Sequence, residues 1–125
     1  MAVDPSRSAL ADLLEEEGSG PIVMLNLLRF APGGRSSYEE YSRRAAPLLK
    51  KYGVELLYAG DGAAPLVAED GQDWDAVLLV RYPDGKTFAR MVTDPEYQKI
   101  TPLRSQALSE AVLQPTLPWA SRRDV

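Results

Sequence analysis

Apolar residues gather in four short segments of the chain, and we predict that each segment is a β-strand. Ile22–Phe30 and Trp74–Tyr82 are almost continuously apolar, which is typical of strands that are buried on both faces. Val54–Asp61 and Ser109–Leu117 complete the set. The pattern therefore predicts a small sheet whose first and third strands are buried on both faces.

The connection between the first two strands carries apolar residues at helical spacing. Ser36 and Ser37 are each followed three residues later by Glu, which is the arrangement of a capping box, so a helix is expected to begin at one of them. Gly53 is expected to close this helix. Pro47 lies inside it and is expected to kink it or to remove one backbone hydrogen bond.

The connection between the third and fourth strands contains two helix-start signals. Asp84 precedes an apolar helical pattern and is expected to cap one helix. The Asp94-Pro95 pair is expected to open another helix, which extends from Glu96 to Leu108. Pro102 lies within this segment, and we expect it to split the helix into two turns.

The order of these elements is β-α-β-β-α-β, preceded by one short helix that begins at Asp4-Pro5. This order predicts an α+β, ferredoxin-like fold, in which a four-stranded antiparallel sheet carries two helices on one face. The predicted domain covers residues 21–117, between an N-terminal helical appendage at 1–20 and a tail at 118–125. A length of 125 residues fits one such domain.

Both faces of the predicted sheet are apolar. In the first strand, Met24 and Leu28 lie on one face, whereas Leu25 and Leu27 lie on the other. The helices can cover only one face, and a bare apolar face indicates an interaction surface. We therefore predict a homodimer in which two sheets stack face to face, so that the fold becomes a dimeric α/β barrel.

The composition excludes several kinds of chemistry. The sequence contains no cysteine and no histidine, so it cannot supply a thiolate nucleophile, a Ser-His-Asp triad or a histidine ligand to haem. No metal or cofactor site is predicted, and the acidic connection 61–75 is interpreted as a solvated hairpin. The net charge of −4 argues against a nucleic-acid partner. With no apolar run that could span a membrane and no signal-peptide pattern, we expect a cytoplasmic protein without a membrane partner.

Four parts of the sequence carry a resemblance to a known family: Val23–Phe30, Ala46–Leu48 with Tyr52-Gly53, Trp74–Val80, and Asp94–Gln98 with Arg104. Together they resemble the domain-of-unknown-function 1330 family of dimeric α/β barrels, over about residues 21–116. The resemblance implies a ferredoxin-like subunit that pairs its sheet with that of a second copy. The wider superfamily includes cofactor-free monooxygenases, haem-degrading enzymes, lactone isomerases and proteins that only bind, so the resemblance implies no single activity.

Three polar residues are candidate catalytic groups. Asn26 lies in the middle of an apolar strand, where an unpaired amide costs about 1–3 kcal/mol, so it is expected either to line a pocket or to bond a neighbouring Tyr or backbone group. Tyr97 and Arg104 are seven positions apart, close to two helical turns, and would share a face if Pro102 leaves the helix continuous. They could anchor an anionic or carbonyl substrate, or they could be a packed Tyr and a surface ion pair.

Tyr41, Tyr58 and Trp74 are candidate substrate-binding residues. Tyr41 and Tyr58 are expected to face inward as pocket walls, although such tyrosines are also common in cores with a wet hydroxyl. Trp74 begins the third strand and is interpreted as an anchor or interface residue rather than as a stacking platform for a ligand. Arg29 falls on the face that meets the second copy, where it needs a carboxylate partner.

Two classes of function remain open. The first is a dimeric α/β-barrel protein that binds a small anionic or carbonyl-bearing metabolite. Such a protein could act as a cofactor-independent enzyme, in which Asn26, Tyr97 and Arg104 stabilise an enolate-like charge. The alternative is a dimeric binding or structural module without turnover. Haem degradation is disfavoured by the lack of histidine. An RNA-recognition module is rejected because the central strands carry aliphatic residues where such modules carry aromatic ones.

Overall fold

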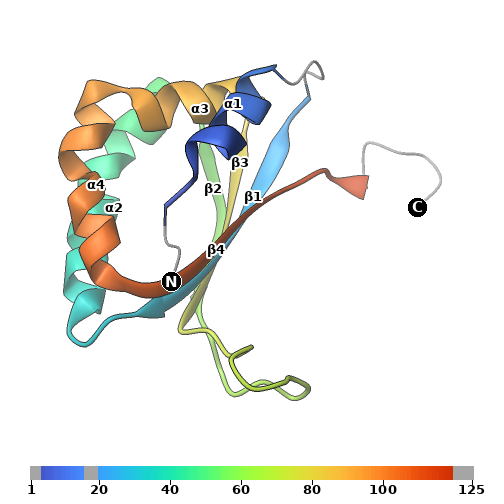
Figure 1. Cartoon of the computed structure of the whole chain (residues 1–125), viewed down its shortest axis with the longest axis vertical. Coiled ribbons are helices and arrows are strands. Elements are labelled where there is room, and N and C mark those ends of the chain that lie inside the picture. Colours follow the sequence, from blue (N-terminus) through green and yellow to red (C-terminus); the bar gives the residue numbers. More distant parts are fainter. Residues whose placement is uncertain (1–3, 16–19, 120–125) are drawn as a thin grey trace.

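The computed structural model describes residues 4–15 and 20–119, and it has the predicted α+β, ferredoxin-like architecture (Figure 1). The sheet order is β2-β3-β1-β4, and every neighbouring pair of strands is antiparallel. Most of the predicted tail, residues 120–125, lies outside the described residues. The elements are α1 (Arg7–Glu15), β1 (Ile22–Phe30), α2 (Gly34–Lys51), β2 (Glu55–Asp61), β3 (Ala76–Tyr82), α3 (Gly85–Thr93), α4 (Pro95–Ala107) and β4 (Leu108–Thr116).

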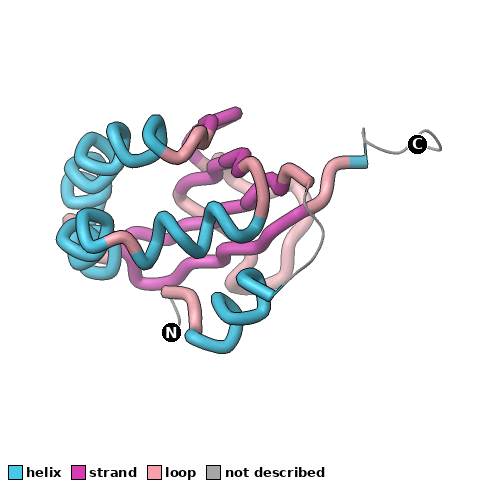
Figure 2. The backbone as a smooth tube through the Cα atoms, turned by 90° about the horizontal axis from the view of Figure 1, so that it is seen from above, coloured by secondary structure: helices cyan, strands magenta, loops and turns pink. Residues whose placement is uncertain are grey.

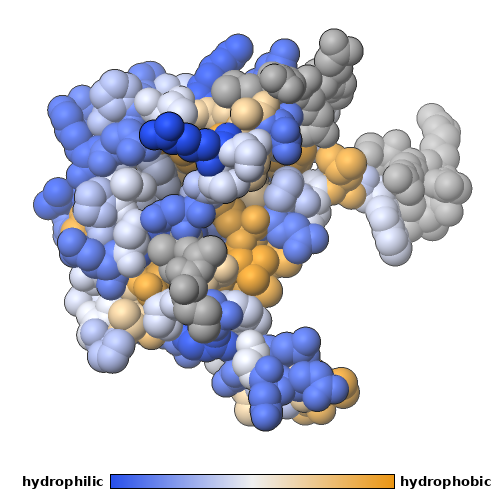
Figure 3. Space-filling model, viewed as in Figure 1, coloured by the Kyte–Doolittle hydropathy of each residue, from blue (hydrophilic) through white to orange (hydrophobic). Residues whose placement is uncertain are grey.

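The helices lie on one side of the sheet and leave the other side open (Figures 1 and 2). Burial alternates along β1, so that Met24 and Leu28 are 1% and 0% exposed beneath the helices. The intervening residues Leu25 and Leu27 are only half-buried, because nothing in the described chain covers their face. Figure 3 shows apolar surface along β1 and β4 on this open side.

The register of the strands extends the open apolar face across the sheet. Leu25 is paired with Leu79 of β3, and Leu27 is paired with Val77 of β3 and with Val112 of β4. Directly paired residues on neighbouring antiparallel strands share a face. The prediction that both faces of the sheet are apolar is therefore confirmed.

The start of α2 differs from the predicted capping box. The helix begins at Gly34, after Gly33 in the left-handed region (φ 72°), and no side chain caps it. A Cβ atom on Gly34 would lie 2.1 Å from the carbonyl oxygen of Ala107, so the chain passes α4 at a distance that only glycine allows. Because of this close approach, α2 begins two residues before Ser36. The pattern of capping residues around Ser36 and Ser37 could not indicate this earlier start.

The predicted N-caps of α3 and α4 are confirmed, but the predicted interruption of α4 is not. Asp84 accepts a hydrogen bond from the backbone N–H of Thr87 at 2.7 Å, and Asp94 accepts one from that of Glu96 at 2.8 Å. The predicted split at Pro102 is wrong, because α4 continues through it. A proline inside a helix removes one backbone hydrogen bond and crowds the preceding turn, and packing of α4 against the sheet and α2 outweighs this cost. No helix in the described part of the chain is both long and apolar enough to cross a bilayer.

Candidate functional site

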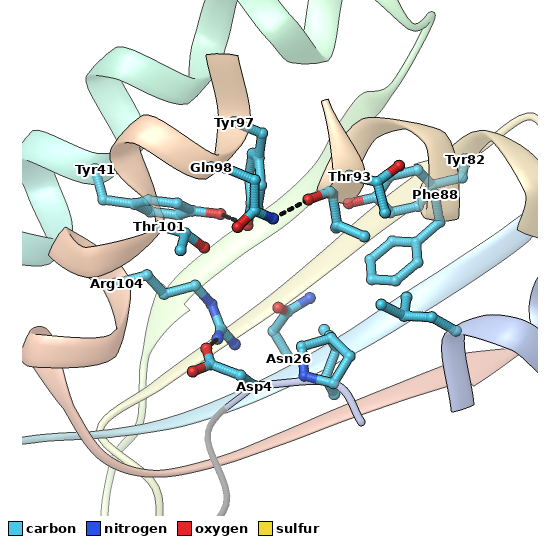
Figure 4. Close-up of a pocket in the computed structure, with 14 residues that line it drawn as sticks. Asp4, Asn26, Tyr41, Tyr82, Phe88, Thr93, Tyr97, Gln98, Thr101 and Arg104 are labelled. Atoms are coloured by element: carbon cyan, nitrogen blue, oxygen red, sulfur yellow. Dashed lines mark hydrogen bonds and ion pairs between the residues drawn. The ribbon is translucent and has the colours of Figure 1, made fainter. Parts of the chain in front are cut away.

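A cavity of about 250 Å³ lies between the helices and the sheet, near the β4 edge (Figure 4). Its walls come from β1, β3, β4, all four helices and the segment that precedes α1. The lining residues are Asp4, Pro5, Leu10, Asn26, Tyr41, Tyr82, Phe88, Val92, Thr93, Tyr97, Gln98, Thr101, Arg104 and Leu113. The cavity therefore combines an apolar wall with several hydrogen-bonding groups, as ligand pockets do.

Asn26 is directed from the centre of β1 into this cavity, on the face that the helices cover. Its side chain is 8% exposed, and its Nδ2 donates a hydrogen bond to the carbonyl oxygen of Met24 at 3.2 Å. This single bond uses one of the two N–H donors of the amide. The residue thus combines the two expected roles, since its amide is partly satisfied by the backbone and also lines the cavity.

Tyr97 and Arg104 both reach the cavity from α4, because the continuous helix keeps residues seven positions apart on one face. Tyr97 is 7% exposed, and its hydroxyl lies 2.6 Å from that of Tyr41 on α2. The two rings meet edge to face, with centroids 6.1 Å apart. The structure therefore brings together four of the predicted site residues: Asn26, Tyr41, Tyr97 and Arg104.

Arg104 is 5% exposed, although it carries a permanent charge. Its Nη1 lies 3.4 Å from Oδ1 of Asp4, in the segment that precedes α1. The hydroxyl of Ser105 donates to the same carboxylate, at 3.0 Å and 3.1 Å to its two oxygens. The helix that was predicted to begin at Asp4-Pro5 begins instead at Arg7, and Ser6 caps it, because its Oγ accepts the N–H of Ala9 at 3.1 Å.

Burial keeps the phenols of this region protonated at neutral pH. Desolvation raises the pKa of Tyr41 well above its ordinary value, and it raises the pKa of Tyr38 to about 12. It also raises the pKa of Tyr82, whose ring packs edge to face on Phe88 with centroids 5.1 Å apart. These tyrosines therefore serve as hydrogen-bonding groups and not as proton acceptors.

Several lining residues were missed by the sequence reasoning, and simple periodicity could have found some of them. Thr101 lies four positions after Tyr97 and three before Arg104, so it occupies the same face of α4. Gln98 follows Tyr97 and donates through Nε2 to the backbone carbonyl of Val92, which joins α4 to α3. The contribution of Asp4 has no local signal, because it depends on how the N-terminal segment folds back.

Tyr58 and Trp74, the other two candidate substrate-binding residues, are not among the described residues that line the cavity. A register shift between Leu56 and Tyr58 sets Leu56 opposite Val80 but Tyr58 opposite Leu79. This bulge moves the Tyr58 ring to the open face of the sheet, where it is 54% exposed. Trp74 lies just before β3, and its ring centroid is 4.5 Å from the Arg29 guanidinium carbon.

Arg29 finds its carboxylate partner within its own chain. It pairs with Glu110 of β4, its Nη2 lies 3.5 Å from Oδ1 of Asp73, and it donates to the carbonyl oxygen of Gly71 at 3.1 Å. These contacts tie the β2–β3 connection to β4. Among the described residues, no group of three or more acidic side chains is gathered closely enough to hold a metal ion.

A second, more open cleft of about 400 Å³ lies between α2 and the β2–β3 side of the sheet. Its charged residues, Arg35, Glu39 and Asp61, are exposed, and Arg35 is paired with Asp61 at 3.0 Å. A surface ion pair of this kind contributes little free energy. The first cavity is the stronger candidate because its polar groups are buried.

Comparisons with known proteins agree with this architecture. A crystal structure of a protein of unknown function from Rhodopseudomonas palustris has a TM-score of 0.83 and 28% sequence identity, and the match covers 92% of this chain and 95% of that one. A dimeric protein of unknown function with a ferredoxin-like fold from Bacteroides fragilis has a TM-score of 0.56 and 10% identity, over 80% and 98% of the two chains. A structure described as a candidate antibiotic biosynthesis monooxygenase from Bacteroides thetaiotaomicron has a TM-score of 0.58 and 20% identity, over 79% and 90%. The last two likenesses concern the fold alone.

No curated protein matches this chain. The family model described as "Domain of unknown function (DUF1330)" matches residues 29–114, which is more than half of the sequence. This match lies within the segment for which the sequence motifs indicated the same family. The chain therefore belongs to the DUF1330 family.

Proposed function

We propose that the cavity binds a small, partly apolar metabolite with an anionic or carbonyl group. The observation that carries this proposal is a nearly fully buried guanidinium, Arg104, beside the Tyr97 hydroxyl and the Asn26 amide. A buried charge is expensive unless a partner of opposite charge or a strong acceptor satisfies it. Arg104 is already paired with Asp4, and because a guanidinium carries five N–H donors it can also bond a ligand oxygen. The apolar wall of Phe88 and Val92 suits the remainder of a small molecule.

The size of the cavity supports a metabolite rather than a large cofactor. Its volume of about 250 Å³ is just below the lower end of the range of about 300–1,000 Å³ that holds drug-sized ligands. The guanidinium offers a planar pair of donors for a carboxylate or enolate. Tyr41 stays a neutral phenol, which can add a hydrogen bond through the Tyr97 hydroxyl.

A cofactor-independent enzyme is a second candidate, supported by the convergence of three donors on one cavity. Arg104, Tyr97 and Asn26 can stabilise the negative charge that develops on a carbonyl oxygen when an adjacent C–H bond is broken. The proton acceptor in such a reaction would be water or a carboxylate, since the chain has no histidine. A binding module without turnover uses the same residues but leaves the C–H bond intact.

We further propose that two copies associate through the open faces of their sheets. Half-buried Leu25, Leu27, Val77, Leu79 and Val112 supply the contact surface. The B. fragilis protein, which is similar in fold, is described as dimeric, and this description supports the proposal. Association would remove the apolar surface from water.

The experiment uses phenylpyruvate as a probe, because it joins an aromatic ring to a keto acid with exchangeable methylene protons next to its ketone. Line broadening in its NMR spectrum reports binding, and deuterium uptake from D₂O at this methylene carbon reports enolate formation. We expect saturable binding to the wild-type protein and its loss in Arg104→Gln. Arg43→Gln, which removes a charge from the exposed surface of α2, is the matched control.

The outcomes separate the two candidates. Binding without accelerated deuterium uptake favours the module without turnover, whereas accelerated uptake that disappears in Arg104→Gln favours the enzyme. Circular dichroism establishes that Arg104→Gln is folded before it is compared. Equal binding to Arg104→Gln and to the wild-type protein contradicts the proposed site.

A further inference from the structure

The N-terminal segment contributes to the cavity although it lies outside the βαββαβ domain. Helix α1 lies beside the β4 edge, apart from α2 and α4 (Figures 1 and 2). Asp4 lies below Arg104 in the view of Figure 4 and lines the cavity together with Pro5. Leu10 of α1 also lines it. The segment therefore closes part of a site whose other walls belong to the sheet and its helices.

The contact between Asp4 and Arg104 is asymmetric. The Arg104 side chain is 6% exposed, whereas the Asp4 side chain is 51% exposed. Asp4 is also the only acidic side chain among the described residues that line the cavity. The buried guanidinium thus meets a carboxylate that is accessible to water and is supplied from the periphery of the fold.

The geometry of this pair leaves room for a better partner. The separation of 3.4 Å between Nη1 and Oδ1 exceeds the range of about 2.7–2.9 Å that is typical of charge-assisted N–H···O bonds. Asp4 divides its oxygens between Arg104 and the hydroxyl of Ser105. A free carboxylate that entered the cavity could instead accept two parallel hydrogen bonds from the guanidinium, one to each of its oxygens.

We propose that the ligand of this cavity is a carboxylate that displaces Asp4 from Arg104, so that the N-terminal segment is a strap that loosens when the ligand binds. This inference rests on the proposed binding function and narrows the ligand to carboxylic acids with a small apolar body. Asp4 is the acidic partner of the buried cation in this structure. Binding then exchanges one carboxylate for another, and the net charge of the cavity stays the same.

The test measures the affinity for phenylacetate by isothermal titration calorimetry, with phenylacetamide as the neutral probe of the same shape. The proteins are the wild type, Asp4→Ala, Asp4→Asn and the control Asp12→Asn, which removes an exposed charge from α1. Removal of the competing carboxylate is expected to raise the affinity for phenylacetate about fivefold to tenfold, the range of one charge-assisted contact. The affinity for phenylacetamide and the affinities of Asp12→Asn are expected to stay at the wild-type values.

A second measurement needs only the wild-type protein. Displacement of Asp4 is expected to loosen the strap, so phenylacetate should accelerate hydrogen exchange at the N–H of Leu10, which bonds the carbonyl oxygen of Ser6 at 3.1 Å. If Asp4→Ala is unstable, Asp4→Asn replaces it in both measurements, because the amide oxygen can still accept a hydrogen bond from Ser105.

Each result decides the inference. Higher affinity in both Asp4 variants, restricted to the carboxylate probe, supports displacement. Wild-type binding that the Asp4 variants leave unchanged or weaken overturns the inference and leaves the proposed function standing. No binding of phenylacetate or phenylpyruvate by any variant overturns the proposed function, and the displacement with it.

Discussion

The Tyr41–Tyr97 pair allows a quantitative test of the geometry of the cavity. The two hydroxyl oxygens lie 2.6 Å apart, on helices α2 and α4. Tyr41→Phe removes one of them and leaves the other buried without this partner, which costs about 1–3 kcal/mol. Tyr97→Phe leaves the Tyr41 hydroxyl without this partner and should cost a similar amount of stability.

The double variant distinguishes a real hydrogen bond from two independent hydroxyls. When both are removed, two apolar rings of nearly unchanged shape remain, so no donor or acceptor is stranded. We expect the double variant to lose less stability than the sum of the single variants, with a coupling free energy of about 1 kcal/mol. For a domain of this length, 1 kcal/mol corresponds to a shift of about 4 °C in Tm.

The assay is urea unfolding of the four proteins, followed by circular dichroism at one protein concentration. Asp12→Asn is the control, because it changes an exposed side chain of α1, and its effect should stay within about 0.5 kcal/mol. Strictly additive losses would show that the two hydroxyls do not bond each other in solution. That result would also mean that no hydrogen bond between these hydroxyls joins α2 to α4 across the cavity.

Three further predictions concern the fold and the assembly. Gly34→Ala should lower the free energy of unfolding by about 1–3 kcal/mol in urea titrations, because its Cβ would meet the carbonyl oxygen of Ala107; a neutral result would mean that the loop relaxes easily. Hydrogen bonds from Tyr52 and from the backbone lower the pKa of Asp94 from 3.8 to about 2, so the stability it contributes is present above pH 4 and is lost as the pH falls towards 2. Asp94→Asn should therefore flatten the acid limb of the stability profile, and an unchanged limb would contradict this assignment. Leu25→Asp should give a monomer in sedimentation experiments at micromolar concentration, whereas a wild-type monomer under the same conditions would contradict association through the open face.

Local chemistry predicted much of the fold. The apolar runs marked the strands, and Asp84 and Asp94 marked the starts of α3 and α4, because an N-cap depends only on residues within one turn. Features set by tertiary contact could not be predicted in this way. The early start of α2 depends on the approach of Gly34 to α4, and the continuity of α4 through Pro102 depends on packing.

The candidate site follows the same division. Alternation predicted that Asn26 shares a face of the sheet with Met24 and Leu28, and in the structure the helices cover that face. Tyr97 and Arg104 both reach the cavity because α4 is continuous, a condition that the spacing alone left open. Alternation failed for Tyr58, because one extra residue in β2 reverses it. It also gave no sign of Asp4, whose contact with Arg104 joins residues 100 positions apart.

The surroundings of the two tryptophans have a practical consequence for spectroscopy. Trp74 lies under the Arg29 guanidinium, and Trp119 is 69% exposed just after β4, so neither indole belongs to the cavity. The cavity itself is lined by three phenol rings, Tyr41, Tyr82 and Tyr97. Indole fluorescence therefore reports on the surroundings of Trp74 and Trp119, outside the cavity. Ligand binding in the cavity changes the surroundings of the phenol rings and is followed by difference absorption, so the two signals can be recorded on one sample.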